Sequence, residues 1–305
     1  MNAIRRTPPR PIDVTTVFPQ LAPLARTAVR LHPRPGSPSP HESSVGGPLL
    51  WPADEPWPYC EERHEWRDEQ TGEQRVGPSA MLPVAQLYVR DVPLLDPPGG
   101  ADLLQVLWCP CEHPPELKPP TALVWRTAAE VTGILAAPPR PTVQEYDDNY
   151  VPEPCLLTPE QITEYPNMLA LDEGTQRQME DWATWEAAGV AMDRSFEDGP
   201  HEYYMEELSD APGWKVGGCP PWGLTDPDDQ FCVTCGAGMV PLLTIASDEW
   251  HPDGHSWIPY ADQDLPGLDL SGTANPPGVQ VSKGNHLQLY VCPESPDHPH
   301  ASLIQ

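Results

Sequence analysis

The chain has 305 residues and a formal net charge of −28, with 45 Asp and Glu against 17 Lys and Arg. Binding to nucleic-acid phosphates needs a basic footprint, so this charge argues against a nucleic-acid partner and allows a basic protein partner. The 44 prolines disfavour long helices, while the 11 tryptophans and a hydrophobic fraction of 39% are enough for a buried core.

Signals for export or membrane insertion are not found in the sequence. No apolar run approaches the roughly 20 residues of a membrane span, and the arginines near the N-terminus are not followed by an apolar segment. We therefore predict a cytoplasmic protein that does not enter the membrane. In a reducing compartment, the eight cysteines are expected to be thiols or metal ligands rather than disulfides.

The predicted elements of the first half are short. An N-terminal lead is expected over residues 1–26, disordered or loosely attached over 1–16, with a short helix possible within 17–28. Runs of alternating or continuous apolar residues predict the first strands. These strands are expected within residues 27–32, 81–89, 103–108 and 123–126.

An acidic stretch follows the first half. Residues 144–210 contain 18 Asp and Glu against two Arg and no Lys, and most of this acid is expected to form a solvated face. Met179, Trp182 and Trp185 recur at helical spacing, which predicts one amphipathic helix within 174–189. We predict a partly helical insertion over 144–213.

The sequence after this stretch repeats features of the first half in the same order. Three pairs of segments match: Val45–Trp51 with Val216–Trp222, Met81–Leu87 with Met239–Ile245, and Leu104–Pro110 with Leu287–Pro293. Shared Gly-Gly, Met-x-Pro and strand-Cys-Pro details favour an internal duplication over chance similarity. The predicted fold class is α+β, mostly β, with similar β-rich lobes at 27–143 and 214–305 and the acidic insertion between them.

A zinc knuckle is predicted at Cys232-Val233-Thr234-Cys235-Gly236. Two thiolates separated by two residues can face one ion if the chain turns tightly, and Gly236 permits the positive φ that such a turn needs. A knuckle supplies two of the four tetrahedral ligands, so two more ligands are expected elsewhere.

The repeat indicates where the other ligands lie. Cys60 corresponds to Cys232, and Cys109 corresponds to Cys292 because each closes a strand before Pro. Closed sets of four Cys and His ligands are typical of structural zinc, so we predict two structural zinc ions. The predicted sets are Cys60, His64, Cys109 and His113, and Cys232, Cys235, Cys292 and His298.

Alternatives remain open for several cysteines. Cys111 can replace His113 as a ligand, and some of the ligand cysteines can instead be buried free thiols, which pack as small hydrophobes. Cys155 and Cys219 have no counterpart in the repeat, and we expect both to be structural.

Two families resemble this pattern. Val45-Gly46-Gly47-Pro48 with Trp51-Pro52, then 82–87, is similar to the opening of YwqG-like domains, a family of uncharacterised function. The second half repeats that pattern with Cys-x2-Cys-Gly, then 239–248, and then Gly284-Asn285, where Asn285 departs from the family's usual Gly-Asp. The arrangement distantly resembles the programmed cell death protein 2 family, in which such elements occur in eukaryotic chaperones for a ribosomal protein. The resemblance spans most of the chain outside 1–25 and 144–210, and implies a mostly β fold with internal symmetry but no established chemistry.

Two functional hypotheses follow. The first is a non-enzymatic, zinc-structured interaction module (a chaperone, adaptor or immunity-type protein) whose acidic surface binds a basic partner. The second is a metal-dependent enzyme acting at the Asp248–His255 loop, where His251, Asp253 and His255 alternate, or in a cleft between the lobes that can take a small molecule. Either a cleft or the core can hold one set of tryptophans, namely Trp51, Trp57, Trp214, Trp222 and Trp257.

Overall fold

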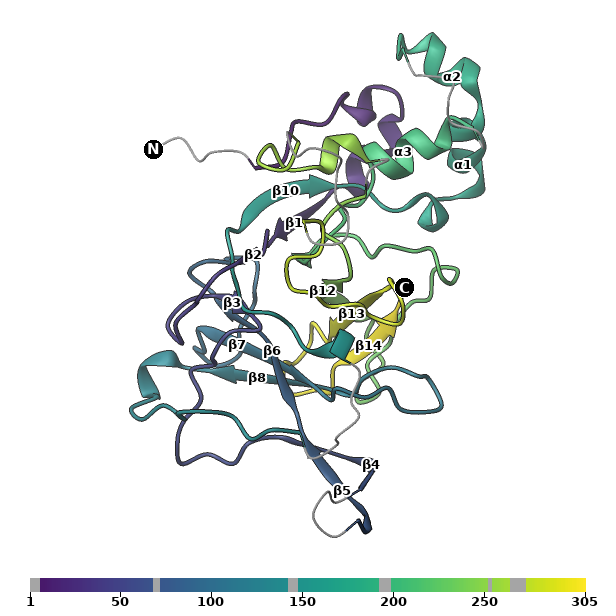
Figure 1. Ribbon diagram of the computed structural model, residues 1–305. Helices are drawn as coiled ribbons and strands as arrows, with labels where there is room; N and C mark the ends of the chain where they lie inside the picture. Colours follow the sequence, from purple (N-terminus) through teal and green to yellow (C-terminus); the bar gives the residue numbers. More distant parts are fainter. Residues whose placement is uncertain (1–5, 68–71, 142–147, 192–198, 252–253, 264–272) are drawn as a thin grey trace.

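The protein is mostly β, with two six-stranded antiparallel sheets and few helices (Figure 1). A computed structural model describes residues 6–67, 72–141, 148–191, 199–251, 254–263 and 273–305. This agrees with the mostly β class predicted from the sequence.

The first sheet has the strand order β10-β1-β11-β12-β13-β14, and each neighbouring pair is antiparallel. Its central strands are apolar because they are covered on both faces for much of their length. The bounds, in sheet order, are β10 Glu160–Glu164, β1 Arg26–Arg30, β11 Lys215–Gly217, β12 Val240–Ala246, β13 His286–Val291 and β14 Ala301–Ile304.

The second sheet has the order β2-β9-β3-β6-β7-β8 and is also antiparallel throughout. A separate two-stranded hairpin, β4 with β5, extends beyond this sheet (Figure 1). The bounds are β2 Arg34–Pro35, β9 Cys155–Leu156, β3 Ser44–Val45, β6 Leu82–Tyr88, β7 Leu103–Trp108, β8 Thr121–Arg126, β4 Tyr59–Arg67 and β5 Gln74–Ala80.

The two sheets share one hydrophobic core. Val106 of β7 and Leu289 of β13 belong to the same cluster of buried side chains, together with Trp214. In β7, Leu104, Val106 and Trp108 join this core, while Leu107 faces the other side, as the two-residue period of a strand requires. The predicted lobes are therefore not separate bodies.

Two segments pass between the sheets. Residues 26–35 form β1 in the first sheet and then β2 in the second, while residues 155–164 form β9 in the second sheet and then β10 in the first. These segments pair antiparallel with each other at both ends. Strands β9 and β10 lie within the stretch predicted as an insertion over 144–213, so part of that stretch belongs to the sheets.

Short helices form a small layer with a core of its own (Figure 1). The predicted amphipathic helix is two helices, because Asp181 ends the first and its carboxylate accepts the amide of Ala183 to begin the second. The bounds are α1 Glu173–Glu180, α2 Trp182–Ala187, α3 His201–Glu207, and the 3-10 turns η1 Val14–Thr16, η2 Pro19–Leu24, η3 Ala128–Glu130, η4 Asp148–Tyr150, η5 Met168–Ala170 and η6 His255–Trp257.

The prediction of a loosely attached lead over 1–16 is wrong for residues 6–16, the part of it that the structure describes. Val14, Phe18 and Leu21 are buried against the helices, and the ring of Phe18 lies edge-on to Trp185 with centroids 4.8 Å apart. Further back, the amide of Thr7 donates to Glu160 at 2.9 Å. The lead is held because these apolar residues pack against helices that lie far along the chain, a contact that local sequence patterns do not predict.

Within the described ranges, no helix combines the length and the apolar character that crossing a membrane would require.

Candidate metal centres

The first candidate centre gathers Cys60, His64, Cys109 and His113, the four residues predicted from the sequence. Cys60 and His64 lie on β4, Cys109 follows β7, and His113 lies in the loop after it. Four residues of regular strand span about 13 Å, too far for two ligands of one ion. Strand β4 shifts register between Cys60 and His64, and this irregularity brings the two side chains together.

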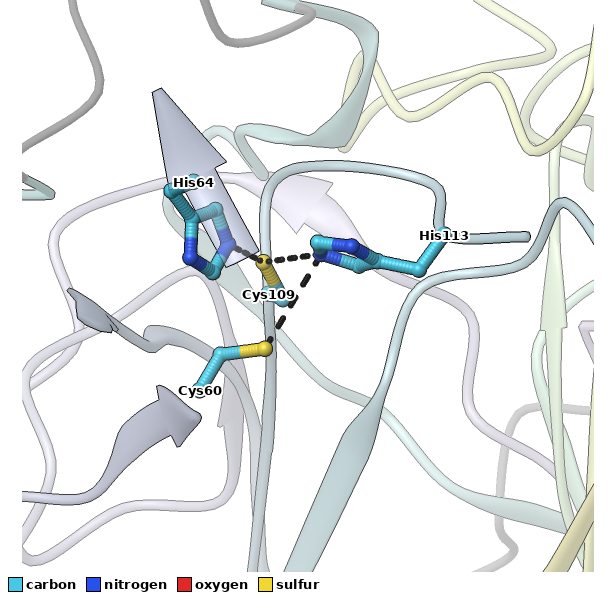
Figure 2. Close-up of side chains that lie close together, drawn as sticks. All are labelled: Cys60, His64, Cys109 and His113. Carbon is cyan, nitrogen blue, oxygen red and sulfur yellow. Dashed lines mark hydrogen bonds between the residues drawn. The ribbon is translucent and has the colours of Figure 1, made fainter. Parts of the chain in front are cut away.

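The spacing of these ligand atoms fits a tetrahedron (Figure 2). His64 Nε2 lies 3.1 Å from Cys109 Sγ, and His113 Nε2 lies 3.4 Å from Cys109 Sγ and 3.9 Å from Cys60 Sγ. A tetrahedral zinc ion with thiolate and imidazole ligands gives edges of about 3.4–3.8 Å. The pocket is thus close to the size that a metal ion of this coordination requires.

The environment of the first centre is dry. Cys60, His64 and Cys109 are buried beside Trp57 and Leu107, while His113 is partly exposed. Burial and the neighbouring His64 lower the pKa of His113, which favours the neutral imidazole that binds metals. A hydrogen bond with Cys109 lowers the pKa of Cys60.

Cys111 is not one of the four gathered ligands. It lies beside the thiol of Cys109, and their hydrogen bond, followed by that with Cys60, raises the pKa of Cys109. His113 therefore completes the set, and the alternative of Cys111 in its place is not favoured by the geometry.

The second candidate centre gathers Cys232, Cys235, Cys292 and His298, again the predicted four. Cys235 Sγ lies 3.5 Å from Cys292 Sγ, and His298 Nδ1 lies 3.3 Å from Cys292 Sγ and 3.5 Å from Cys232 Sγ. All four ligand atoms lie within 4.8 Å of one another, as they do in the first centre. These separations also match the edges of a zinc tetrahedron.

The loop from Cys232 to Cys235 has the geometry of a zinc knuckle. The amide of Gly236 donates to the Cys232 carbonyl at 2.8 Å, and Gly236 has a φ of 74°, which a residue with a side chain rarely adopts. Burial opposes ionisation of Cys232, but hydrogen bonds from the amides of Cys235 and Thr234 lower its pKa. Amide donors of this kind stabilise a thiolate that binds a metal.

Cys292 is the most acidic of these thiols. Burial raises its pKa, yet the hydrogen bond from His298 and those from the amides of Glu294 and Ser295 outweigh burial and bring the pKa to about 6. The hydrogen bond with Cys292 raises the pKa of His298 in turn. A metal ion would displace the proton that Cys292 and His298 share and would bind all four ligand atoms.

Each candidate centre takes ligand residues both from a peripheral loop or hairpin and from the end of a central strand. Cys109 directly follows β7 and Cys292 directly follows β13, while the partner cysteines come from the β4 hairpin and from the knuckle. The second centre is the more accessible one, since Cys235 is exposed. Both arrangements supply four protein ligands.

Comparison with known proteins does not place the chain in a family. No family model matches it, and no curated protein matches it. The resemblance to YwqG-like domains and the distant one to the programmed cell death protein 2 family therefore stay predictions.

Among the described residues of the Asp248–His255 loop, no comparable cluster of possible ligands is found. His251 and His255 are exposed, and Asp253 lies outside the described residues. In the part of the chain that the structure describes, neither histidine belongs to a group of three or more possible metal ligands. Buried neighbours of this loop, including Trp250 and Trp257, serve the core.

The remaining predicted residues are mostly structural. Trp51, Trp57, Trp214 and Trp257 are buried, whereas Trp222 is partly exposed. Cys155 and Cys219 are buried away from both centres, and burial raises the pKa of each to about 12, so both remain thiols.

Two cavities lie near the second centre, and the first is lined by both halves of the chain, as expected for the predicted cleft between the lobes. One of 390 Å³ has Cys292, Arg26 and Trp125 in its walls. A larger one of 530 Å³ shares Arg26, Val240 and Pro241 with the first. Their walls come from segments far apart in the chain. No local sequence signal identifies such a surface.

Proposed function

We propose that the protein is a non-enzymatic, zinc-structured protein-interaction module, a chaperone, adaptor or immunity-type protein. The observation that carries this proposal is the pair of closed Cys/His tetrads, each pinning a loop to a central strand. Structural zinc sites are four-coordinate with protein ligands alone, whereas catalytic sites keep one position for water. We also propose that the chain is related to YwqG-like domains, the family of uncharacterised function that its sequence resembles.

Zinc is the metal that suits these ligand sets. One set has two thiolates and two imidazoles, and the other has three thiolates and one imidazole. Soft sulfur ligands in a tetrahedron favour zinc over magnesium, calcium or manganese. The ion would add its binding free energy to folding, because the unfolded chain does not hold the ligands together.

Elemental analysis of protein purified without added metal tests the zinc proposal. We expect two zinc ions per chain, and chelation under denaturing conditions should prevent refolding. Absence of metal, or disulfides between these cysteines, would contradict the proposal.

We also propose that the two sheets arose by duplication. The second sheet repeats the first strand by strand, and β6 and β12 have the same irregularity, between Pro83 and Ala85 and between Pro241 and Leu243. A buried polar pair recurs at the same register, with Gln105 donating to Gln86 at 2.9 Å and Gln288 donating to Thr244 at 3.4 Å. On this scheme the second repeat begins near Cys155, and the helices of 173–207 are inserted inside it.

The acidic surface is the third part of the proposal. Charge of this density attracts a basic partner mainly by long-range steering, which salt screens over a Debye length of about 8 Å at physiological ionic strength. We expect affinity for a native partner to fall as salt rises, and to fall with Glu173→Gln and Glu180→Gln, which are exposed on α1. Glu207 does not serve this test, since it is buried and accepts the amide of Ser256 at 2.8 Å.

A further inference from the structure

The 530 Å³ cavity near the second centre is an open groove with both apolar and polar walls, here named the β12 groove. Leu24, Leu169 and Val240 line it and remain 42%, 42% and 39% exposed. Side chains of this kind are normally buried when they lie together, and a contiguous apolar surface marks a site of interaction. Trp222 and Tyr290 also line the groove and offer aromatic surface.

The first half of the chain shows how the matching place is filled. Trp51, which corresponds to Trp222, lines a smaller cavity of 210 Å³ that Leu135 and Pro138 narrow. Residues 133–138 cross Trp51 as an extended segment, with the amide of Leu135 donating to the Trp51 carbonyl at 2.8 Å. That segment covers the apolar face with a leucine and a proline.

In the second half, no residue that the structure describes covers Trp222 in the way that residues 133–138 cover Trp51. The carbonyl of Trp222 accepts a hydrogen bond from the side chain of Asn167 at 3.1 Å, in place of a backbone amide. Asn167 and Leu169 then form a wall of the β12 groove rather than crossing it. The floor consequently stays accessible to an additional extended chain.

Charge at the groove defines the kind of chain that fits. Asp228 and Asp229 line it, and the one basic side chain among its lining residues is Arg26. Both aspartate side chains are exposed, so they can reach a bound ligand. A peptide with Lys or Arg beside its apolar residues would complement this rim.

We infer that the β12 groove binds an extended segment of a partner protein, in which an apolar anchor side chain is flanked by Lys or Arg. This inference rests on the proposed interaction function and assigns its site. The anchor takes the place that Leu135 takes in the first half, and the basic residues face Asp228 and Asp229.

Selection from a displayed library of random dodecapeptides tests this inference with the full chain as bait. Enriched peptides are synthesised, and their affinity is measured for the wild type, Val240→Arg and the double variant Asp228→Asn/Asp229→Asn. The matched control is Leu156→Arg, because Leu156 is 38% exposed on the other sheet and lines neither cavity beside the second centre. Zinc content and melting temperature are measured on every variant.

We expect apolar-basic peptides whose affinity falls about tenfold or more with Val240→Arg, as for loss of an interface anchor, and severalfold with the aspartate variant. Leu156→Arg should bind as the wild type does. A lack of enriched peptides, or peptides that bind Val240→Arg and the wild type equally, would overturn the inference and leave the zinc proposal intact. Groove-dependent binding by a protein without zinc would uphold the inference and overturn the zinc proposal.

Discussion

The ammonium group of Lys215 lies 2.9 and 3.0 Å from the two carboxylate oxygens of Glu164, and neither side chain is exposed. Glu164 ends β10 and Lys215 begins β11, and β1 lies between these two strands, so the ion pair reaches across β1. Glu164 also accepts the amides of Ala211 and Cys219, each at 2.9 Å. One carboxylate thus holds the segment before β11 and the segment after it.

Removal of one member of this pair should be strongly destabilising. Lys215→Met leaves a buried carboxylate without its cation, and the expected loss is about 3–5 kcal/mol of unfolding free energy. Lys215→Met/Glu164→Gln removes the buried charge and keeps an oxygen for one of the two amides, so it should lose less than Lys215→Met alone. Urea unfolding measures both, and a double variant no more stable than Lys215→Met would contradict this account.

The two metal centres should fail one at a time. Cys60→Ala removes a ligand of the first centre, and Cys235→Ala removes one from the second. Each variant is expected to hold one zinc ion instead of two, because a structural site needs all four ligands to retain the ion against a chelator. Mass spectrometry under native conditions, or elemental analysis after brief chelation, gives the count.

Cysteines outside the tetrads provide the controls for metal content. Cys155→Ala and Cys111→Ser should each keep two ions, since neither belongs to a gathered set. Loss of an ion from Cys111→Ser with retention in His113→Ala would show that the ligand assignment at the first centre is wrong.

The ligand sets could be predicted from the sequence because their chemistry is local and rare. Cys and His are few in this chain, and Cys232 and Cys235 at knuckle spacing fix the kind of site. The repeat then located the distant ligands, since Cys109 and Cys292 each end a central strand before Pro.

Other features depend on tertiary contacts that local patterns do not encode. Strand β10 is acidic and alternates weakly, yet Glu164 at its end is buried because Lys215 neutralises it. Val14, Phe18 and Leu21 recur at helical spacing, but the side chains that bury them lie far along the chain. The shared core of the two sheets likewise depends on how the strands are arranged in space. The sequence repeat shows which segments correspond, but it does not determine that arrangement.

The contact of Phe18 with Trp185 yields a prediction about the helical layer. Phe18→Ala removes a fully buried ring from a small core, with an expected cost of about 3–5 kcal/mol. Because that core is separate from the shared core of the sheets, α1 to α3 should lose amide protection while β7 and β13 keep it. Hydrogen exchange resolves the two regions, and uniform loss of protection would show that the layer is not an independent unit.

Glu249 is a buried carboxyl group with incomplete hydrogen bonding. Its Oε1 accepts the amide of Trp214 at 2.9 Å, while Oε2 has no hydrogen-bond partner among the described residues. Burial raises the pKa of Glu249 from 4.5 to about 7, despite the opposing charge of Arg30. The folded protein therefore keeps this proton over a range of pH where the unfolded chain has released it.

This difference should make stability fall as pH rises. Between pH 4.5 and about 7 the folded state binds more protons at Glu249 than the unfolded state, so its contribution to unfolding free energy declines and is fully lost above pH 7. At about 1.4 kcal/mol per pKa unit, the loss is about 3 kcal/mol.

Glu249→Gln cannot ionise, so its stability relative to wild type should rise by that amount between pH 5 and pH 8. Taking the difference between the two proteins cancels the opposite effect of His32, whose pKa burial lowers to about 4. Urea unfolding across this range measures the change, and a difference independent of pH would refute the ionisation assigned to Glu249.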